Sequence, residues 1–221
     1  MMKERLTIAM DGPAGSGKST IAQRLAEELD YLYLNSGSMY RAMTLLSIRE
    51  GTDSTNVPML TKLAKRCRID FTDNGKTTLL NGEDVSDALR TPEIDRTIVN
   101  IAKIPEVRHE MVKQQRRIGE KGGIIVEGRD VTTVVFPDAD LKFYISASVE
   151  ERAKRRFGEQ EAKGIETTLE QVEQEIRERD QTDESRDHSP LRTAEDAIVL
   201  DTTSMTVNQA VDFVLNRVEA S

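Results

Sequence analysis

Cysteine and histidine are scarce in this sequence. Its 221 residues include one cysteine, Cys67, and two histidines, His109 and His188. A single cysteine excludes a disulfide bond within the chain and a cysteine-based zinc site, and the two separated histidines give no metal-ligand spacing. We expect Cys67 to be a half-buried helix residue, as free cysteines commonly are, and both histidines to lie at the surface.

Long apolar runs and an excess of basic residues are also missing. No apolar run reaches the ~20 residues that a membrane-spanning helix needs. The N-terminal stretch MMKERLTIAMDG turns polar too early to form the core of a signal peptide, so we expect a cytoplasmic protein. Lys and Arg number 31 against 39 Asp and Glu, a formal charge of −8, which disfavours a broad nucleic-acid-binding surface. We expect a monomer without membrane or nucleic-acid partners.

Five short apolar runs alternate with segments whose apolar residues recur at helical spacing. This alternation is typical of an α/β fold in which helices cover both faces of a parallel sheet. The length suits one such domain with small insertions. We expect strands at residues 6–10, 31–34, 123–126, 141–145 and 197–200, and helices over 20–29, 38–49, 59–67, 105–119, 149–157, 169–179 and 207–218.

Two segments interrupt the alternation. Residues 68–85 contain Asn-Gly pairs at 74–75 and 81–82, which are strong signals for tight turns, so we expect a small antiparallel meander inserted into the fold. Residues 150–188 contain eight basic residues, Lys163 among them, and thirteen acidic residues. Such dense mixed charge with few apolar anchors predicts a mobile, exposed element.

The sequence GPAGSGKS at 12–19 fits the P-loop pattern. It follows an expected strand and opens an expected helix, which favours a phosphate-binding loop over a simple glycine-rich turn. Glycines let backbone N–H groups point at a phosphate, and the helix N-terminus adds partial positive charge. Lys18 can reach the outer phosphates, and the Ser19 hydroxyl suits Mg²⁺. We expect the triphosphate of ATP to be held by Gly12, Pro13, Ala14, Gly15, Ser16, Gly17, Lys18, Ser19 and Thr20.

Charged residues follow the third apolar run, in the sequence IVEGRD at 125–130. Ligands of such sheets bind at the carboxyl ends of the strands. Glu127 can orient Mg²⁺ through water, Arg129 can hold a second phosphate, and Asp130 can accept hydrogen bonds. The alternative is a turn with solvated charges, which the position at the strand end disfavours.

Further cations occur in two helical segments. Ser36 stands where an N-cap would be, and Arg41 follows within the next turns, although these two alone fit an ordinary capped helix with a solvated arginine better. The second segment is either a salt-bridged surface helix or a lid whose arginines close on transferring phosphates. Its candidate residues are Arg152, Arg155, Arg156, Arg179 and Arg186.

Together, these segments resemble the bacterial cytidylate (CMP/dCMP) kinase family over nearly the whole chain. The P-loop is shared by many enzymes, whereas the other segments in combination are specific to this family. The matching stretches are IAMDGPAGSGKST at 8–20, LNSGSMYRA at 34–42, NGEDVSDALRTPEI at 81–94, EGRDVTTVVFPDADLKFYISAS at 127–148 and ERD…D…R at 178–186.

The resemblance implies an α/β fold of the P-loop NTPase type with a five-stranded parallel sheet and flanking helices. A monophosphate-binding insertion with a small antiparallel sheet would occupy about 59–104, and a lid about 150–188. The core would then consist of 1–58, 105–149 and 189–221. The implied reaction moves the γ-phosphate of ATP, with Mg²⁺, to CMP or dCMP, giving CDP or dCDP in pyrimidine nucleotide metabolism.

Individual roles also follow from the resemblance. Ser36 and Arg41 would contact CMP, and Arg129 and Arg186 would bind phosphate. The cytosine would be read by Arg108 and Asp130, and the sugar would be held by Arg179 and Asp183.

The chain departs from the family at two positions. Some members have a serine that touches cytosine where Val99 stands here, next to Asn100. The acid at the strand end is aspartate in some members and Glu127 in this chain, which keeps the charge on a longer side chain.

Two other functions are open at this point. The first is a related P-loop kinase acting on AMP, UMP or shikimate. The second is a nucleotide-controlled switch, which the absence of an NKxD guanine-reading motif disfavours.

Overall fold

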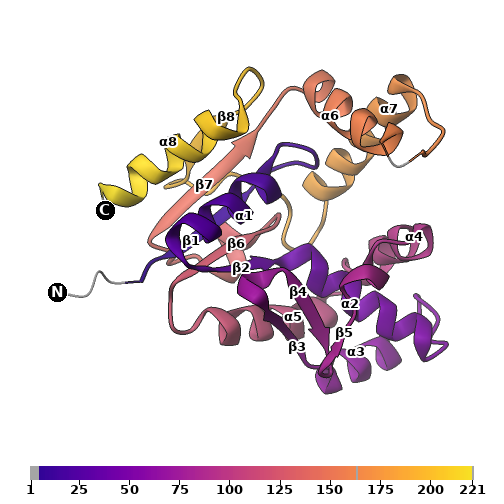
Figure 1. Cartoon of the computed structure of the whole chain (residues 1–221). Coiled ribbons are helices and arrows are strands. Elements are labelled where there is room, and N and C mark those ends of the chain that lie inside the picture. Colours follow the sequence, from indigo (N-terminus) through magenta and orange to yellow (C-terminus); the bar gives the residue numbers. More distant parts are fainter. Residues whose placement is uncertain (1–4, 163, 221) are drawn as a thin grey trace. The chain divides into compact units, whose positions relative to one another are not determined.

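The computed structural model describes residues 5–162 and 164–220, so Lys163 lies outside the described part. A five-stranded sheet has the order β2-β6-β1-β7-β8, and β1–β7 and β7–β8 pair in parallel (Figure 1). The predicted parallel sheet is confirmed, and each predicted strand begins at the observed residue or one before it. The strands are β1 (Thr7–Asp11), β2 (Leu32–Asn35), β6 (Ile124–Glu127), β7 (Leu141–Ser146) and β8 (Ile198–Asp201).

The described residues form two compact units. The first unit comprises residues 5–7 and 26–126, and the second comprises 8–25, 127–162 and 164–220. No helix in the described part is long and apolar enough to span a membrane.

The first unit contains the predicted antiparallel meander as a separate three-stranded sheet. Both Asn-Gly pairs have left-handed backbones, with φ of 52° and 94° at 74–75 and 52° and 87° at 81–82. A side chain at Gly75 would place its Cβ 1.9 Å from the carbonyl oxygen of Tyr33, so only glycine fits there. The elements are β3 (Ile69–Thr72), a 3₁₀ turn (Asp73–Gly75), β4 (Thr77–Leu80), β5 (Glu83–Asp84) and a second 3₁₀ turn (Ser86–Leu89).

Four helices complete the first unit: α2 (Ser36–Arg49), α3 (Val57–Arg66), α4 (Pro92–Ile101) and α5 (Pro105–Gly119). Helix α4 was not predicted from the sequence, although Thr91 is a capping residue that accepts a hydrogen bond from the Ile94 N–H and Pro92 occupies the first turn. The predicted N-cap of α2 was wrong. Asn35 caps the helix by accepting from the Ser38 N–H, and Ser36 is already helical.

The lone cysteine lies at the C-terminus of α3. Cys67 is fully buried rather than half-buried, and its Sγ donates to the carbonyl oxygen of Ala64. Burial raises the pKa of this thiol, which keeps it protonated. His109 and His188 are exposed, as predicted.

The second unit contains β1, β7, β8 and the start of α1 (Lys18–Leu29). Its apolar core includes Ile8, Met10 and Phe143, all fully buried. A single irregular π-helical turn, Val131–Val135, follows β6. The remaining helices are α6 (Val149–Glu161), α7 (Leu169–Glu184) and α8 (Val207–Glu219).

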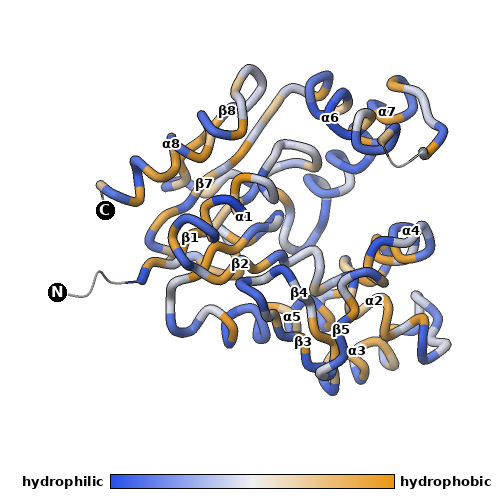
Figure 2. Tube along the Cα trace, in the orientation of Figure 1, coloured by the Kyte–Doolittle hydropathy of each residue, from blue (hydrophilic) through white to orange (hydrophobic). Residues whose placement is uncertain are grey.

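Helices α6 and α7 lie side by side and are largely hydrophilic (Figures 1 and 2). A small apolar cluster of Ala153, Val172 and Ile176 holds the pair together, with Phe157 packed against it. The charge-rich segment therefore has its own apolar anchors, and both of its predicted helices are confirmed with longer C-terminal ends.

Candidate active site

The P-loop lies between β1 and α1, as the sequence predicts. Gly12 has φ 148°, and a Cβ there would lie 2.0 Å from the carbonyl oxygen of Ile145, so the loop can leave the strand only through glycine. The loop backbone is tied from outside at two carbonyls. Arg152 Nη1 donates to Ala14 O at 3.1 Å, and Thr202 Oγ1 donates to Ser16 O at 3.0 Å. These bonds hold the loop in shape.

Lys18 is buried at the first turn of α1 and points back at the loop. Its Nζ donates to the Pro13 carbonyl oxygen at 2.7 Å and to Ser16 Oγ at 3.3 Å. Burial, together with the charge of Arg129, lowers the pKa of Lys18 to about 7, while Glu127 opposes the shift. A buried ammonium with so low a pKa favours an anionic ligand, because a nearby negative charge would raise the pKa of Lys18 back toward its ordinary value.

The two proposed Mg²⁺ residues offer oxygen donors. Ser19 is exposed at the start of α1, and Glu127 is buried at the carboxyl end of β6. Residues 5–162 and 164–220 contain no group of three or more His, Cys, Asp or Glu that could cage a metal. Kinases hold Mg²⁺ through one or two protein oxygens plus substrate phosphates and water, so a hydroxyl and a carboxylate fit this ion.

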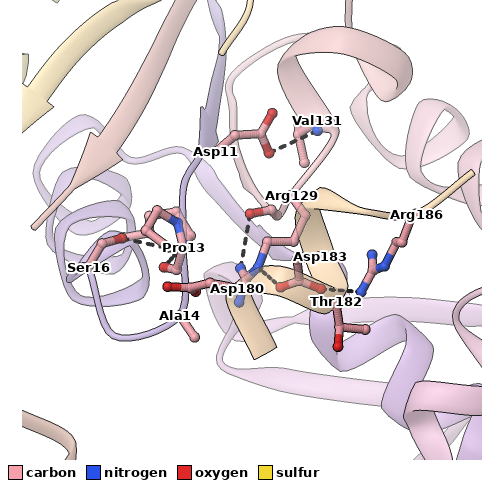
Figure 3. Close-up of polar contacts among 12 residues, drawn as sticks. Asp11, Pro13, Ala14, Ser16, Arg129, Val131, Asp180, Thr182, Asp183 and Arg186 are labelled. Atoms are coloured by element: carbon pink, nitrogen blue, oxygen red, sulfur yellow. Dashed lines mark hydrogen bonds and ion pairs between the residues drawn. The ribbon is translucent and has the colours of Figure 1, made fainter. Parts of the chain in front are cut away.

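Arg129 and Arg186 converge on one buried carboxylate (Figure 3). Arg129 Nε donates to Asp183 Oδ2 at 2.8 Å, and Arg186 Nη2 donates to the other oxygen, Oδ1. Burial by itself would raise the pKa of Asp183, but the two guanidinium groups outweigh burial and hold that pKa below its ordinary value. Arg179 is exposed one helical turn before Asp183, and its charge acts in the same direction. The structure thus brings together four predicted site residues.

Arg152 does not behave as a solvated helix residue. Its side chain is 4% exposed, and Nε donates to the Ala147 carbonyl oxygen at 3.0 Å. Nη1 forms an ion pair with Asp180 Oδ2 at 2.7 Å besides its bond to Ala14. Arg156, one turn further along α6, is partly exposed. The surface salt-bridge interpretation therefore fails for Arg152, whose charge faces the P-loop backbone and α7.

Sequence reasoning missed Asp11, the last residue of β1. Its carboxylate is fully buried and accepts hydrogen bonds from the Val131 and Thr132 N–H groups. Asp130, also buried, immediately precedes these donors. The available signal was an acidic residue that ends an apolar strand next to a P-loop, but its partners lie 120 residues away along the chain.

The other predicted residues gather around the N-terminal half of α2 in the first unit. Ser36 is buried in the first turn of that helix. Arg41 pairs with Asp95 at 2.6 Å and donates to the Leu89 carbonyl oxygen at 3.1 Å.

Arg108 approaches the same helix from α5. The side chain is buried, and its guanidinium carbon lies 5.3 Å from the ring centroid of Tyr40, a residue that the sequence analysis did not select. Its Nη1 also donates to the Ala102 carbonyl oxygen at 3.1 Å. A ring face and a carbonyl therefore orient this cation.

The departure noted at Val99 lies on the surface of α4, where this side chain is 52% exposed. The neighbouring Asn100 donates from Nδ2 to Ser54 Oγ at 3.4 Å. The structure thus places a serine hydroxyl from a different part of the chain beside Asn100.

Comparison with known proteins identifies the family. The family profile described as Cytidylate kinase matches residues 8–220. A Bacillus subtilis (strain 168) protein named cytidylate kinase is 46% identical over 220 residues, covering 99% of this chain and 98% of its own. Another protein of that name, from Anoxybacillus flavithermus, is 44% identical over 216 residues, covering 97% of this chain and 96% of its own.

Solved structures show the same fold at low sequence identity. An uncharacterised protein from Eubacterium ventriosum superimposes with a TM-score of 0.55 at 13% identity, covering 98% of this chain and all of its own. Shikimate kinase from Acinetobacter baumannii, in complex with shikimate, gives 0.50 at 15% identity, covering 98% and 94%. These two likenesses support the P-loop kinase fold alone, whereas the profile and the near-complete sequence matches show that the chain belongs to the cytidylate kinase family.

Proposed function

We propose that the polar cluster of the second unit carries phosphoryl transfer in this chain. As a member of the cytidylate kinase family, the chain transfers the γ-phosphate of ATP to CMP or dCMP, giving CDP or dCDP. The observation that supports the residue assignment is the grouping of buried Lys18 with Arg129, whose charge lowers the pKa of that lysine, and with the Arg129–Asp183–Arg186 cluster.

Phosphoryl transfer to CMP requires positive charge and correct positioning of the substrates, and it does not require a general base. The acceptor is a phosphate that is already anionic, and the transferring group spreads its charge over equatorial oxygens. Lys18, Arg129 and Arg186 would stabilise that charge, joined by Arg152 and Arg156 from the helix pair. Residues 12–20 would hold the remaining ATP phosphates, and every residue of this stretch except Pro13 has a backbone N–H to donate. Excluding water prevents wasteful hydrolysis.

The acceptor roles are those that the family resemblance implies. Ser36 and Arg41 would contact the CMP side, and Arg108 would contact cytosine. Asp130 would accept from the exocyclic amine of cytosine, while Arg179 and Asp183 would hold the sugar.

Mg²⁺ would be held by the Ser19 hydroxyl and, through water, by the Glu127 carboxylate. When bound, this ion supplies charge neutralisation on the ATP phosphates. Within the chain, the charge of Glu127 already acts on Lys18 by raising its pKa.

The proposal extends to the organisation of the chain. Residues 59–104 would form the monophosphate-binding insertion, and residues 150–188 would form the lid over a core of 1–58, 105–149 and 189–221. The apolar cluster between α6 and α7 supports a lid that moves as one piece. We also propose a cytoplasmic monomer that binds neither nucleic acid nor membranes, in keeping with its net charge of −8.

Coupled ADP release with ATP and a panel of acceptors tests the assignment. We expect fast turnover with CMP and dCMP, and slow turnover with AMP, UMP and shikimate. ATP turnover that is independent of CMP would favour the nucleotide-controlled switch instead. Repeating the panel with Arg129→Ala and Arg156→Ala separates the cluster at Asp183 from the outer arginine of α6.

A further inference from the structure

A buried carboxylate at the end of β1 has no part in the function proposed above. Asp11 immediately precedes Gly12 and is fully buried. Its Oδ1 accepts from the Val131 N–H at 2.9 Å (Figure 3). Its Oδ2 accepts from the Thr132 N–H at 2.7 Å and from Thr132 Oγ1 at 2.6 Å. Three donors on one side chain offset part of the cost of burying its charge, although burial still raises the pKa of Asp11 above its ordinary value.

All three hydrogen bonds are donated by Val131 and Thr132, directly after the two residues of this loop that are proposed to bind CMP. Arg129 and Asp130 directly precede Val131 in the chain. The N–H groups of Val134 and Val135 donate to the Asp130 carbonyl oxygen, so the π turn closes on itself from there. The N–H groups that open a helical turn have no partner within it, and here Asp11 supplies that partner.

The other side of the same loop is also tied to β1. The Gly128 N–H donates to the carbonyl oxygen of Met10 at 2.9 Å. Residues 128–132 are therefore fastened at both ends to two consecutive residues of β1, with Arg129 and Asp130 between the fastenings. The Asp11 side chain supplies the contacts that follow these two residues and thereby fixes their position.

The P-loop is held by different bonds. Its carbonyls at Pro13, Ala14 and Ser16 accept from Lys18, Arg152 and Thr202, respectively. Loss of the Asp11 bonds would therefore loosen residues 128–132 more than it would loosen the ATP-binding loop.

We propose that Asp11 is a positioning residue that sets the place of Arg129 and Asp130 by anchoring Val131 and Thr132. The inference rests on the proposed roles of Arg129 and Asp130. The charge of Asp11 also raises the pKa of Lys18, so a variant that keeps this carboxylate and removes one of its hydrogen bonds isolates the positioning role. Such a variant should raise the KM for CMP and lower kcat while leaving the KM for ATP unchanged.

Thr132→Val is the most specific test, because it removes one of the three donors and keeps the side-chain shape. We expect kcat/KM for CMP to fall about tenfold, as expected for one lost hydrogen bond to a charged group. Thr132→Ser retains the hydroxyl and should restore the parent value. Thr133→Val makes the same change at the next residue, outside the three bonds to Asp11, and serves as the matched control. Asp11→Asn should lower kcat/KM for CMP further, because the amide NH₂ group would face N–H donors.

The outcomes are separable even if Asp11→Asn fails to fold. The inference is overturned if Thr132→Val keeps the parent kcat/KM for CMP, if it raises the KM for ATP as much as that for CMP, or if Thr133→Val loses as much. Failure of Thr132→Ser to restore activity overturns it as well. Arg129→Ala, measured alongside, separates failure of the proposed function from failure of this inference. Parent-like kinetics of Arg129→Ala would overturn the proposed site. Impaired Arg129→Ala together with normal Thr132→Val would overturn only the role of Asp11.

Discussion

The two units hold their arginines in different ways. In the second unit, Arg129 and Arg186 share the carboxylate of Asp183, which is 4% exposed. In the first unit, Arg41 pairs with Asp95, whose side chain is 52% exposed. A solvated pair contributes little and is exchanged easily, whereas breaking a buried pair leaves charge without compensation. A phosphate could therefore replace Asp95 as the partner of Arg41 with little loss of free energy. To bind Arg129 and Arg186, a phosphate would have to compete with the Asp183 carboxylate.

Removing a cation from the second unit outright should have the largest effect. Lys18→Met should lower kcat by about a hundredfold to a thousandfold, because Lys18 is proposed to stabilise charge that develops during transfer. Thermal unfolding should show an intact fold, since the hydrogen bonds that Lys18 loses are to two neutral groups, the Pro13 carbonyl and the Ser16 hydroxyl. An unchanged turnover number in a coupled ADP-release assay would remove the P-loop assignment.

Breaking the buried pair directly should produce the next largest effect. Asp183→Asn leaves Arg129 and Arg186 without their shared anion, and we expect about 2–4 kcal/mol lower stability, below the ~3–5 kcal/mol of a fully buried pair because both arginines are about a fifth exposed. Urea unfolding of the ligand-free protein measures the change. A loss below ~1 kcal/mol would mean that the pair behaves like a surface contact.

The lowered pKa of Lys18 makes ATP binding depend on pH. The phosphates restore the pKa of this ammonium, so binding takes up a proton wherever the free lysine is neutral, which begins near its pKa of about 7. Affinity for ATP should be flat below about pH 7 and weaken by up to about tenfold per pH unit above it. Calorimetric titration from about pH 6.5 to 8.5 checks this. Lys18→Arg stays charged, so an equal slope in that variant would assign the pH dependence to another group.

The first unit offers a smaller change at Tyr40, whose ring lies beneath the Arg108 guanidinium. Tyr40→Leu should raise the KM for CMP about threefold to tenfold, in line with one cation–π contact. Tyr40→Phe keeps the ring face and serves as the control. If both variants lose equally, the hydroxyl of Tyr40 matters and not its ring.

The smallest effect is expected at the exposed pair of the first unit. Asp95→Asn should change stability by less than ~1 kcal/mol, in contrast to Asp183→Asn. Urea unfolding under the same conditions compares the two variants. Equal losses of unfolding free energy in Asp95→Asn and Asp183→Asn would mean that the exposed and the buried ion pairs contribute alike to stability.

The sequence was most informative where structure is local. The P-loop, the strands and the Asn-Gly turns were predicted because a few consecutive residues determine each of them. Helix α4 was not predicted although Thr91 and Pro92 mark its start, because the insertion was interpreted from the turns at residues 68–85, which lie just before this helix. The cap of α2 was misplaced by one residue because Asn35 and Ser36 are both good capping residues.

Long-range polar contacts could not be read from spacing. Arg129 and Asp183 are 54 residues apart, and only the family resemblance suggested that they share a site. Asp11 and Thr132 are 121 residues apart, and nothing in the sequence near Asp11 indicates that donor. A pattern of residue types carries no information about which distant donor fills a buried carboxylate.

The shared carboxylate of Asp183 also affects which anions can occupy the site. A free phosphate ion offers Arg129 and Arg186 a negative charge, but it leaves the buried carboxylate facing a second anion. In the proposed assignment a nucleotide would satisfy both groups, since its phosphate would bind the guanidinium groups while its sugar hydroxyls would donate to Asp183. With these roles, Asp183 would compete with free phosphate for the two arginines at all times, so inorganic phosphate in the cell would block the nucleotide site less.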